Sequence, residues 1–167
     1  MSSAYVAVNL TVPSEGVSLD TYFDPAGIQT YCIGHADFEG KAKESYTEDE
    51  CVEIFVKDWT KHEKQLDSLK LKFSSEWQRA ALTDFTFNLG IGNVSSSTLV
   101  SLIRKQEHEL ACDQLIRWVY AGGVILKGLV VRREETKPYC LGEVDTESRE
   151  YKEFEKFCSR THEYQSV

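Results

Sequence analysis

A short hairpin followed by a long amphipathic helix is the feature that most constrains how this chain folds. Residues 24–27, DPAG, place Asp, Pro and Gly at the first, second and fourth positions that a type I turn prefers. Residues 30–33, TYCI, suit the returning strand. Thr47 and Glu50 form a predicted capping box, after which apolar side chains recur at helical spacing as far as Leu66. A helix of this length suits a rod between two lobes.

Helices are predicted for most of the remaining chain. Segment 74–90 is apolar over much of its circumference, so it is expected to be the central core helix. Further helices are expected at 97–106, at 108–123 with a stop at Gly122–Gly123, at 127–137 with a stop before Pro138, and at 145–160. Near the amino terminus, Pro13 is expected to block a regular helix and Ser14 to cap a short turn.

Together these elements predict an α+β, mostly helical fold with two lobes. The amino-terminal lobe holds the hairpin and spans about residues 15–60, and the helical lobe spans about 66–142. Residues 143–167 are expected to form an acidic helical extension to a main domain at 1–142.

The extension has an apolar face of its own. Tyr151, Phe154 and Cys158 lie at helical spacing, so this face is expected to dock on the larger lobe or on a partner. The alternative is that the extension acts through its acids, by repelling anionic polymers over a long range.

The charge of the chain excludes nucleic acid as its main partner. The 167 residues carry a formal net charge of −8, whereas phosphate binding needs a basic surface. Residues 37–67 hold ten acids and five bases, and residues 143–167 hold seven and four. No window approaches the length of an apolar membrane span, and the amino-terminal residues lack the features of a signal peptide. The sequence does not indicate how the protein would leave the cytoplasm.

Glu15, Asp24 and Thr30 carry the chemistry that a hydrolase needs. Alone, each has an ordinary structural explanation: a solvated acid, a turn residue and a strand residue. Together they suit glycoside hydrolysis, in which one carboxylic acid protonates the leaving oxygen and a second carboxylate serves water or the sugar cation. A hydroxyl near the second carboxylate can hold that water. The residues alone do not decide between inversion and retention.

The stretch around these residues resembles the phage lysozyme family, the muramidases that bacteriophages use as endolysins. The family pattern is matched by Glu15-Gly16, Leu19, Tyr22, Asp24, Gly27, Thr30 and Gly34-His35. The resemblance continues in FNLGIGN, SSSTL, RWVYAGG and GLVVRRE and covers roughly residues 15–142. It implies a lysozyme-like fold whose catalytic domain, residues 1–142, cleaves the bond between MurNAc and GlcNAc in peptidoglycan.

The resemblance also implies roles for individual residues. Glu15 would be the general acid, and Asp24 and Thr30 would position the attacking water, with inversion at the anomeric carbon. His35 would be mainly structural and would pair with an acid.

Three further residues, and the setting of the reaction, follow from the same resemblance. Phe87, Asn88 and Thr98 fall where the family lines its sugar cleft, although Phe87 equally suits the core. No metal and no cofactor are implied. The chain is expected to be a monomer that is made in the cytoplasm of a bacterial host and acts on the cell wall or in the periplasm after release. The resemblance does not distinguish between three biological roles: a lysis enzyme, a virion entry enzyme and a secreted toxin.

The cysteines and histidines leave alternatives open. Cys32 stands where the family pattern has glycine, and it either pairs with Cys51 in an oxidising compartment or stays a buried thiol. Four possible zinc ligands are weak evidence because their two pairs lie far apart in sequence; they are Cys32, His35, Cys158 and His162. His62 lies on an apolar helix face and is interpreted as an interior histidine.

A non-enzymatic lysozyme fold, kept for glycan binding or for assembly, is the alternative function. The acidic surface and the extension favour it. Glu15, Asp24 and Thr30 argue against it, because a binding module need not retain them.

Overall fold

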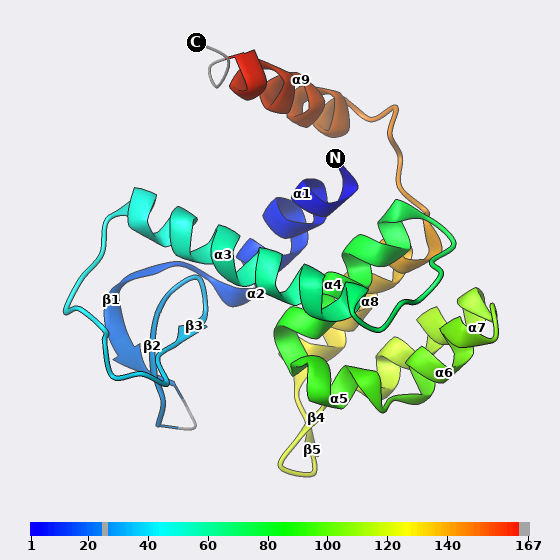
Figure 1. Cartoon of the computed structure of the whole chain (residues 1–167), viewed down its shortest axis with the longest axis horizontal. Coiled ribbons are helices and arrows are strands. Elements are labelled where there is room, and N and C mark those ends of the chain that lie inside the picture. Colours follow the sequence, from blue (N-terminus) through cyan, green and yellow to red (C-terminus); the bar gives the residue numbers. More distant parts are fainter. Residues whose placement is uncertain (25–26, 164–167) are drawn as a thin grey trace.

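The long helix α3 (Glu48–Asp67) joins the two lobes of the molecule (Figure 1). The computed structural model describes residues 1–24 and 27–163, with side chains as far as residue 158. Thr47 caps α3: its hydroxyl accepts a hydrogen bond from the Glu50 N–H, and the Glu50 carboxylate accepts one from the Thr47 N–H. The predicted capping box and the predicted connecting helix are confirmed.

The small lobe is built on three antiparallel strands, in the order β1-β2-β3. The strands are β1 (Ser18–Phe23), β2 (Gln29–Cys32) and β3 (His35–Ala36). Tyr22 of β1 pairs with Thr30 of β2, so the predicted hairpin is confirmed. The two central residues of its predicted type I turn, 25 and 26, lie outside the described residues. The buried cluster of this lobe is small and consists of Tyr31, Cys32, Tyr46 and Cys51.

The amino-terminal segment follows a helical path that leads to Glu15. Its parts are α1 (Ser2–Val6), the π-helix η1 (Ala7–Thr11) and α2 (Val12–Glu15). The prediction that Pro13 blocks a helix is wrong, because Pro13 lies in the first turn of α2, directly after the wider π turns, where a missing N–H costs least. Ser14 lies inside α2 instead of capping a turn, and the helix ends at Gly16 with φ +74°.

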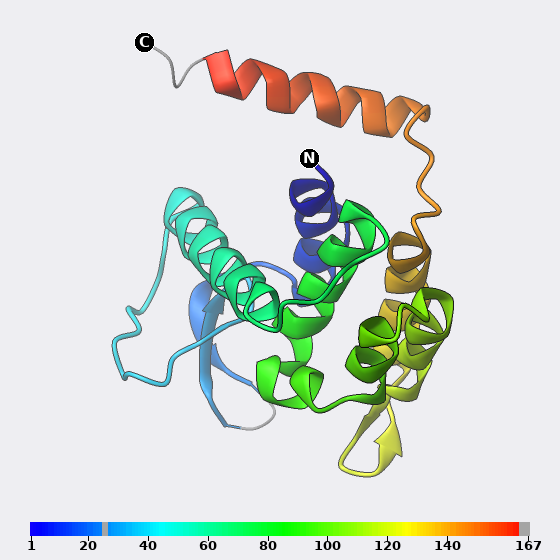
Figure 2. The same ribbon diagram turned by 45° about the vertical axis from the view of Figure 1, so that its right-hand side comes forward.

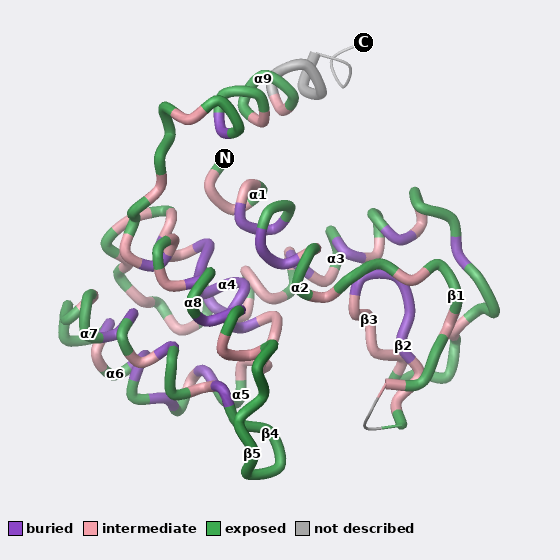
Figure 3. The backbone as a smooth tube through the Cα atoms, turned by 180° about the vertical axis from the view of Figure 1, so that it is seen from behind, coloured by how far each residue is buried: buried purple, intermediate pink, exposed green. Residues whose placement is uncertain are grey.

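Helix α4 (Glu76–Leu89) forms the centre of the large lobe and is mostly buried, as predicted (Figure 3). Ser75 caps its start by accepting a hydrogen bond from the Gln78 N–H, and Gly90 ends it. The helices that follow it are α5 (Ile91–Ser95), α6 (Thr98–Arg104) and α7 (His108–Asp113). The apolar core between them includes Leu82, Phe85, Leu99, Ile103 and Leu115.

The segment predicted as one helix at 108–123 is a helix, a turn and a hairpin. Helix α7 stops at Asp113, and the 3-10 helix η2 (Gln114–Arg117) follows. The chain then forms β4 (Tyr120–Ala121) and β5 (Val124–Ile125), which are paired. Gly122 and Gly123 have φ of +59° and +79°, so they form the two-residue turn of this hairpin and do not stop a helix.

Helix α8 (Lys127–Leu141) runs through Pro138, so the prediction that it ends before the proline is wrong. The proline lies in the last turn, and the carbonyl that loses its partner belongs to Glu134, which is exposed to water. Cys140 anchors the end of the helix through a disulfide to Cys112. The helix then ends at Gly142, which has left-handed backbone.

The extension forms the predicted helix α9 (Arg149–Glu163), which lies beside the amino terminus (Figure 2). The rings of Tyr151 and Phe154 each lie 5.1 Å from the ring of Tyr5 on α1, and Tyr151 also contacts Trp77. The apolar face therefore docks on the body of the same chain, where it covers α1 and the start of α4.

Candidate active site

Glu15 ends α2, and an arginine of the large lobe fixes one oxygen of its carboxylate. The Arg132 Nη1 atom lies 2.5 Å from Glu15 Oε1 and donates a hydrogen bond to it. Arg132 belongs to α8 and is nearly buried, whereas the Glu15 side chain stays partly exposed. The helix that carries Glu15 and the helix that carries Arg132 are thereby joined at this acid.

The other oxygen of Glu15 lies against the small lobe, at Gly34. A Cβ atom on Gly34 would stand 2.9 Å from Glu15 Oε2, and the φ of Gly34 is +67°. Both the space and the left-handed backbone therefore require glycine between β2 and β3. The carboxylate of Glu15 lies between the lobes, with one oxygen toward each.

Arg132 also binds a second acid, in the interior. Its Nη2 atom donates to Asp84 Oδ1 at 2.8 Å, and Asp84 is fully buried in α4. Asp84 also accepts hydrogen bonds from the hydroxyls of Thr11 and Thr136. Burial disfavours the charge on Arg132, but the charges of Asp84 and Glu15 outweigh it and raise the pKa of the guanidinium. One cation therefore serves two carboxylates.

Asp24 and Thr30 both bond to the backbone of Ile28, at the end of the β1–β2 hairpin. The Asp24 carboxylate accepts a hydrogen bond from the Ile28 N–H at 2.8 Å, and the Thr30 hydroxyl donates to the Ile28 carbonyl at 3.2 Å. Thr30 is buried, and Asp24 is partly exposed. The hairpin thus brings these two candidates together on the lobe that Glu15 meets at Gly34.

His35 ties the sheet to α3. Its Nδ1 atom lies 2.5 Å from Asp58 Oδ2, and this hydrogen bond raises the pKa of His35 against the opposing effect of burial. One turn further along α3, His62 Nδ1 lies 2.7 Å from the Asp58 carbonyl oxygen, and its ring packs on Phe87. Burial lowers the pKa of His62, in agreement with its interpretation as an interior histidine.

A cavity of about 650 Å³ opens beside Glu15, and Asn88 is the predicted sugar-cleft residue that lines it. Phe87 packs instead against the rings of Phe55 and Trp59 beneath α3. Thr98 is exposed at the first position of α6. Sugar contacts of these three predicted residues stay a prediction, and Asn88 is the one next to the acid.

Residues 13–136 match the sequence model of the phage lysozyme family. The chain belongs to this family. The SAR-endolysin of Bacteriophage PS119 is 39% identical over 127 residues, which are 76% of each chain. The SAR-endolysin of Enterobacteria phage P21 is 38% identical over 143 residues, 83% of this chain and 87% of the relative. The solved active form of the P1 phage endolysin Lyz has the same fold, with a TM-score of 0.74 at 22% identity over 89% of both chains.

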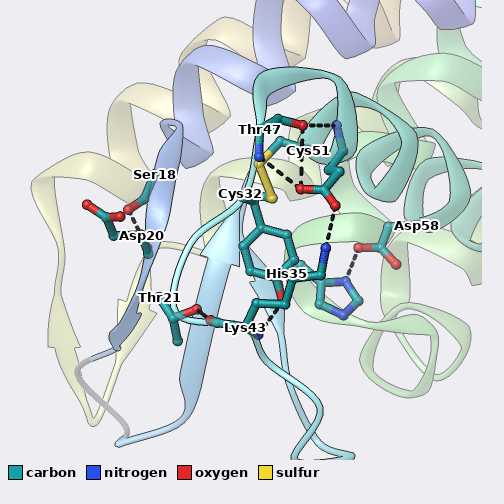
Figure 4. The surroundings of a disulfide bond; sticks show 11 residues. Ser18, Asp20, Thr21, Cys32, His35, Lys43, Thr47, Cys51 and Asp58 are labelled. Atoms are coloured by element: carbon teal, nitrogen blue, oxygen red, sulfur yellow. Dashed lines mark hydrogen bonds and ion pairs between the residues drawn. A yellow bond between two sulfur atoms is a disulfide. The ribbon is translucent and has the colours of Figure 1, made fainter.

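This phage lysozyme departs from the family pattern at Cys32, where the pattern has glycine. The φ of Cys32 is +56°, in the left-handed region that favours glycine, so a cysteine occupies a backbone conformation that suits the glycine of the pattern. A disulfide joins Cys32 to Cys51 on α3, close to the His35–Asp58 pair (Figure 4). Of the two alternatives for Cys32, the structure contains the pairing with Cys51.

The same bond bears on the zinc hypothesis. The sulfur of Cys32 is used in the disulfide, and the side chain of His162 lies outside the described part of the chain. Within the described residues, no group of three or more His, Cys, Asp or Glu side chains is placed to hold a metal ion.

Sequence reasoning missed the arginines of this lysozyme. Arg132 and Arg133 lie in the charged run RREETK, which is typical of a solvated helix. The available signal was Asp84, because an acid in the middle of an apolar helix needs a buried partner. Arg133 is also buried: it donates to Asn88 Oδ1 and lies over the Phe85 ring, and burial lowers its pKa to about 10.

Proposed function

We propose that this phage lysozyme is a muramidase, which hydrolyses the glycosidic bond between MurNAc and GlcNAc in peptidoglycan. The observation that carries the proposal is the position of Glu15, which Arg132 holds from the large lobe while Oε2 lies against Gly34 of the small lobe. Asp24 and Thr30 stand on that same small lobe, tied to one backbone unit. Glu15 lies between the two lobes, and Asp24 and Thr30 lie on one of them. This arrangement suits the cleavage of a glycan chain that lies across both lobes.

The roles follow from the contacts of each group. Arg132 occupies Oε1 of Glu15, so Oε2 is the atom that would carry the proton to the leaving oxygen as the bond from the anomeric carbon breaks. Thr30 would orient the attacking water, and Asp24 would accept a proton from it. The oxygen of that water would bond to the anomeric carbon from the face opposite the leaving oxygen. Attack from that face gives inversion.

Glu15→Gln tests the assignment. The amide keeps the shape but has no acidic proton to give, so hydrolysis of purified walls should fall by about 10²–10⁴-fold with an unchanged fold. Asp24→Asn should also be severe, because it removes the charge that faces the developing cation. Glu134→Gln, an exposed change on α8, is the matched control and should keep full activity.

Turbidity of wall suspensions and release of reducing ends would measure these rates. Turnover of Glu15→Gln within tenfold of wild type would contradict the assignment of the acid. A well-folded wild-type protein that clears no walls but binds them would favour the non-enzymatic glycan-binding alternative.

The relatives named SAR-endolysin suggest the setting of this reaction. We infer that the chain serves lysis, acting on the host cell wall after its synthesis in the host cytoplasm and its release. None of the described helices has the length and apolar character needed to cross a bilayer. A monomer suffices for the proposed reaction, because Glu15, Asp24, Thr30 and Arg132 all come from one chain.

A further inference from the structure

An apolar groove of about 850 Å³ runs between the amino-terminal helices and α3. Figures 1 and 2 show the ribbons of α1 and α3 near each other. Ala4 and Val8 line one side, and Val52 and Val56 of α3 line the other. It shares no lining residue with the cavity beside Glu15. The proposed hydrolysis therefore gives this groove no role.

The groove leaves aliphatic side chains in water. Val8 is 51% exposed, Val17 59%, Val52 55% and Val56 54%. Exposed apolar side chains that gather in one concave surface, unlike scattered ones, mark a binding site. The occupant must itself be apolar, which a glycan is not.

A row of lysines begins where the groove ends on α3. Val56 lines both the groove and an adjoining depression, and Lys57, Lys61 and Lys64 line that depression. The three lysines share one side of the helix because they are spaced at i, i+4 and i+7. Within the part of the chain that the structure describes, none of them forms an ion pair, although the chain has a net charge of −8.

The acids of α3 do not neutralise this row. Glu63 lines the groove but is bound to Arg79. Asp58 is bound to His35, and Asp67 is bound to Arg79. Glu53 lies one turn before Lys57, away from Lys61 and Lys64. What lies next to the apolar groove is therefore a row of lysines that are in no ion pair with the described acids, on a helix whose total charge is negative.

We propose that this face binds an anionic phospholipid surface, with an acyl chain in the groove and phosphate groups over Lys57, Lys61 and Lys64. Hydrocarbon leaves water on entering the groove, and each lysine adds about fivefold in affinity for an anionic bilayer. A second copy of this chain is a poorer occupant, because a symmetric pair would bring two lysine rows together.

Vesicle cosedimentation of the full chain tests the charged half of the proposal. The wild type should bind phosphatidylglycerol vesicles, more weakly as salt rises, and should bind phosphatidylcholine vesicles less. The triple variant K57Q/K61Q/K64Q should bind phosphatidylglycerol about 100-fold more weakly than wild type. The matched control K72Q/K105Q/K152Q has the same charge change on exposed lysines elsewhere and should bind far better than the first triple.

Fluorescence quenching tests the apolar half, since Trp59 lines the groove while Trp77 and Trp118 do not. Phosphatidylglycerol with brominated acyl chains should quench tryptophan emission of the wild type and leave emission of Trp59→Phe almost unquenched. Val56→Asp, which puts a charge on the groove wall, should abolish binding and quenching. Val124→Asp, on the exposed strand β5, is the control and should abolish neither.

Three results would overturn the proposal: equal binding to both lipids, unquenched Trp59 in the bound protein, or a dimer in solution that Val56→Asp dissociates. Hydrolysis of purified, lipid-free walls should be unchanged in Val56→Asp and in the lysine variant. A failure of lipid binding with intact wall hydrolysis would therefore leave the muramidase proposal standing. Intact lipid binding with no wall hydrolysis would leave the lipid proposal standing and contradict the muramidase proposal.

Discussion

The two lobes are stabilised by different means, although both contribute groups to the candidate site. The large lobe has a continuous apolar core that includes Leu82, Phe85 and Leu99, all fully buried. The small lobe buries the stacked rings of Tyr31 and Tyr46 and closes on a disulfide. The large lobe thus depends on buried area, and the small lobe depends on a few specific bonds. Asp24 and Thr30 stand on the lobe whose geometry rests on fewer contacts.

Truncation in the large core should have the largest effect on stability. Leu99→Ala removes a fully buried side chain, so unfolding free energy should fall by about 2–5 kcal/mol. Ile33→Ala, a truncation of the same size at a less completely buried side chain of a smaller cluster, should cost less than Leu99→Ala. Urea denaturation of both variants measures the difference, and equal losses would contradict the contrast between the lobes.

Each lobe contains one disulfide, so removing each bond in turn makes the same chemical change in the two lobes. Their sequence separations are 19 residues for Cys32–Cys51 and 28 for Cys112–Cys140, so loop entropy predicts a similar stabilisation of about 3 kcal/mol from each. Cys32→Ser should in addition lower hydrolysis, because Cys32 lies two residues before Gly34, whereas Cys112→Ser should lower stability alone.

Peptide mapping provides the check on these bonds. None of Cys32, Cys51, Cys112 and Cys140 should react with an alkylating agent before reduction, and all four should react afterwards. Alkylation of any of the four in the untreated, folded protein would end the corresponding assignment.

The contrast between the lobes also explains what the sequence predicted and what it did not. The first hairpin was predictable because Asp24 and Gly27 specify a turn, whereas Gly122–Gly123 follow an apolar run that equally suits the end of a helix. The helix cap at Thr47 was found from local chemistry. The Arg132–Asp84 pair joins residues far apart in the chain, and nothing local in RREETK shows which charge is buried.

Docking of α9 should make a smaller contribution to stability than the core or the disulfides. The double variant Tyr151→Ala/Phe154→Ala loses the ring contacts with Tyr5, worth about 1–2 kcal/mol, so the melting temperature should fall by about 4 °C. Lys156→Ala, on the exposed side of α9, should leave it unchanged. If the extension acts through charge instead, truncation after Gly142 would leave melting unchanged and tighten wall binding at low salt alone.

The smallest expected effect is a pH dependence of stability through the two histidines that contact or lie on α3, His35 and His62. Folding raises the pKa of His35, so its stabilising contribution is complete below 6.5, the ordinary value, and is lost as the pH rises through the higher folded value. The pKa of His62 is lowered, so its contribution is present above 6.5 and is lost as the pH falls.

Melting curves of His35→Asn and His62→Asn between about pH 5 and pH 8 check these opposite signs. The deficit of His35→Asn relative to wild type should shrink as the pH rises, and the deficit of His62→Asn should shrink as the pH falls. Parallel curves for the two variants would refute the opposite shifts.

The sharing of Arg132 between two acids sets an order in which this site can decay during evolution. A lineage that loses Glu15 first keeps a neutral Arg132–Asp84 pair and a sound interior. A lineage that loses Arg132 first takes away the guanidinium partner of the buried Asp84 and leaves it, among the described residues, with the hydroxyls of Thr11 and Thr136, a burden on folding that selection would remove. Descendants that have given up catalysis should therefore retain the arginine and the buried aspartate as a record of the enzyme they came from.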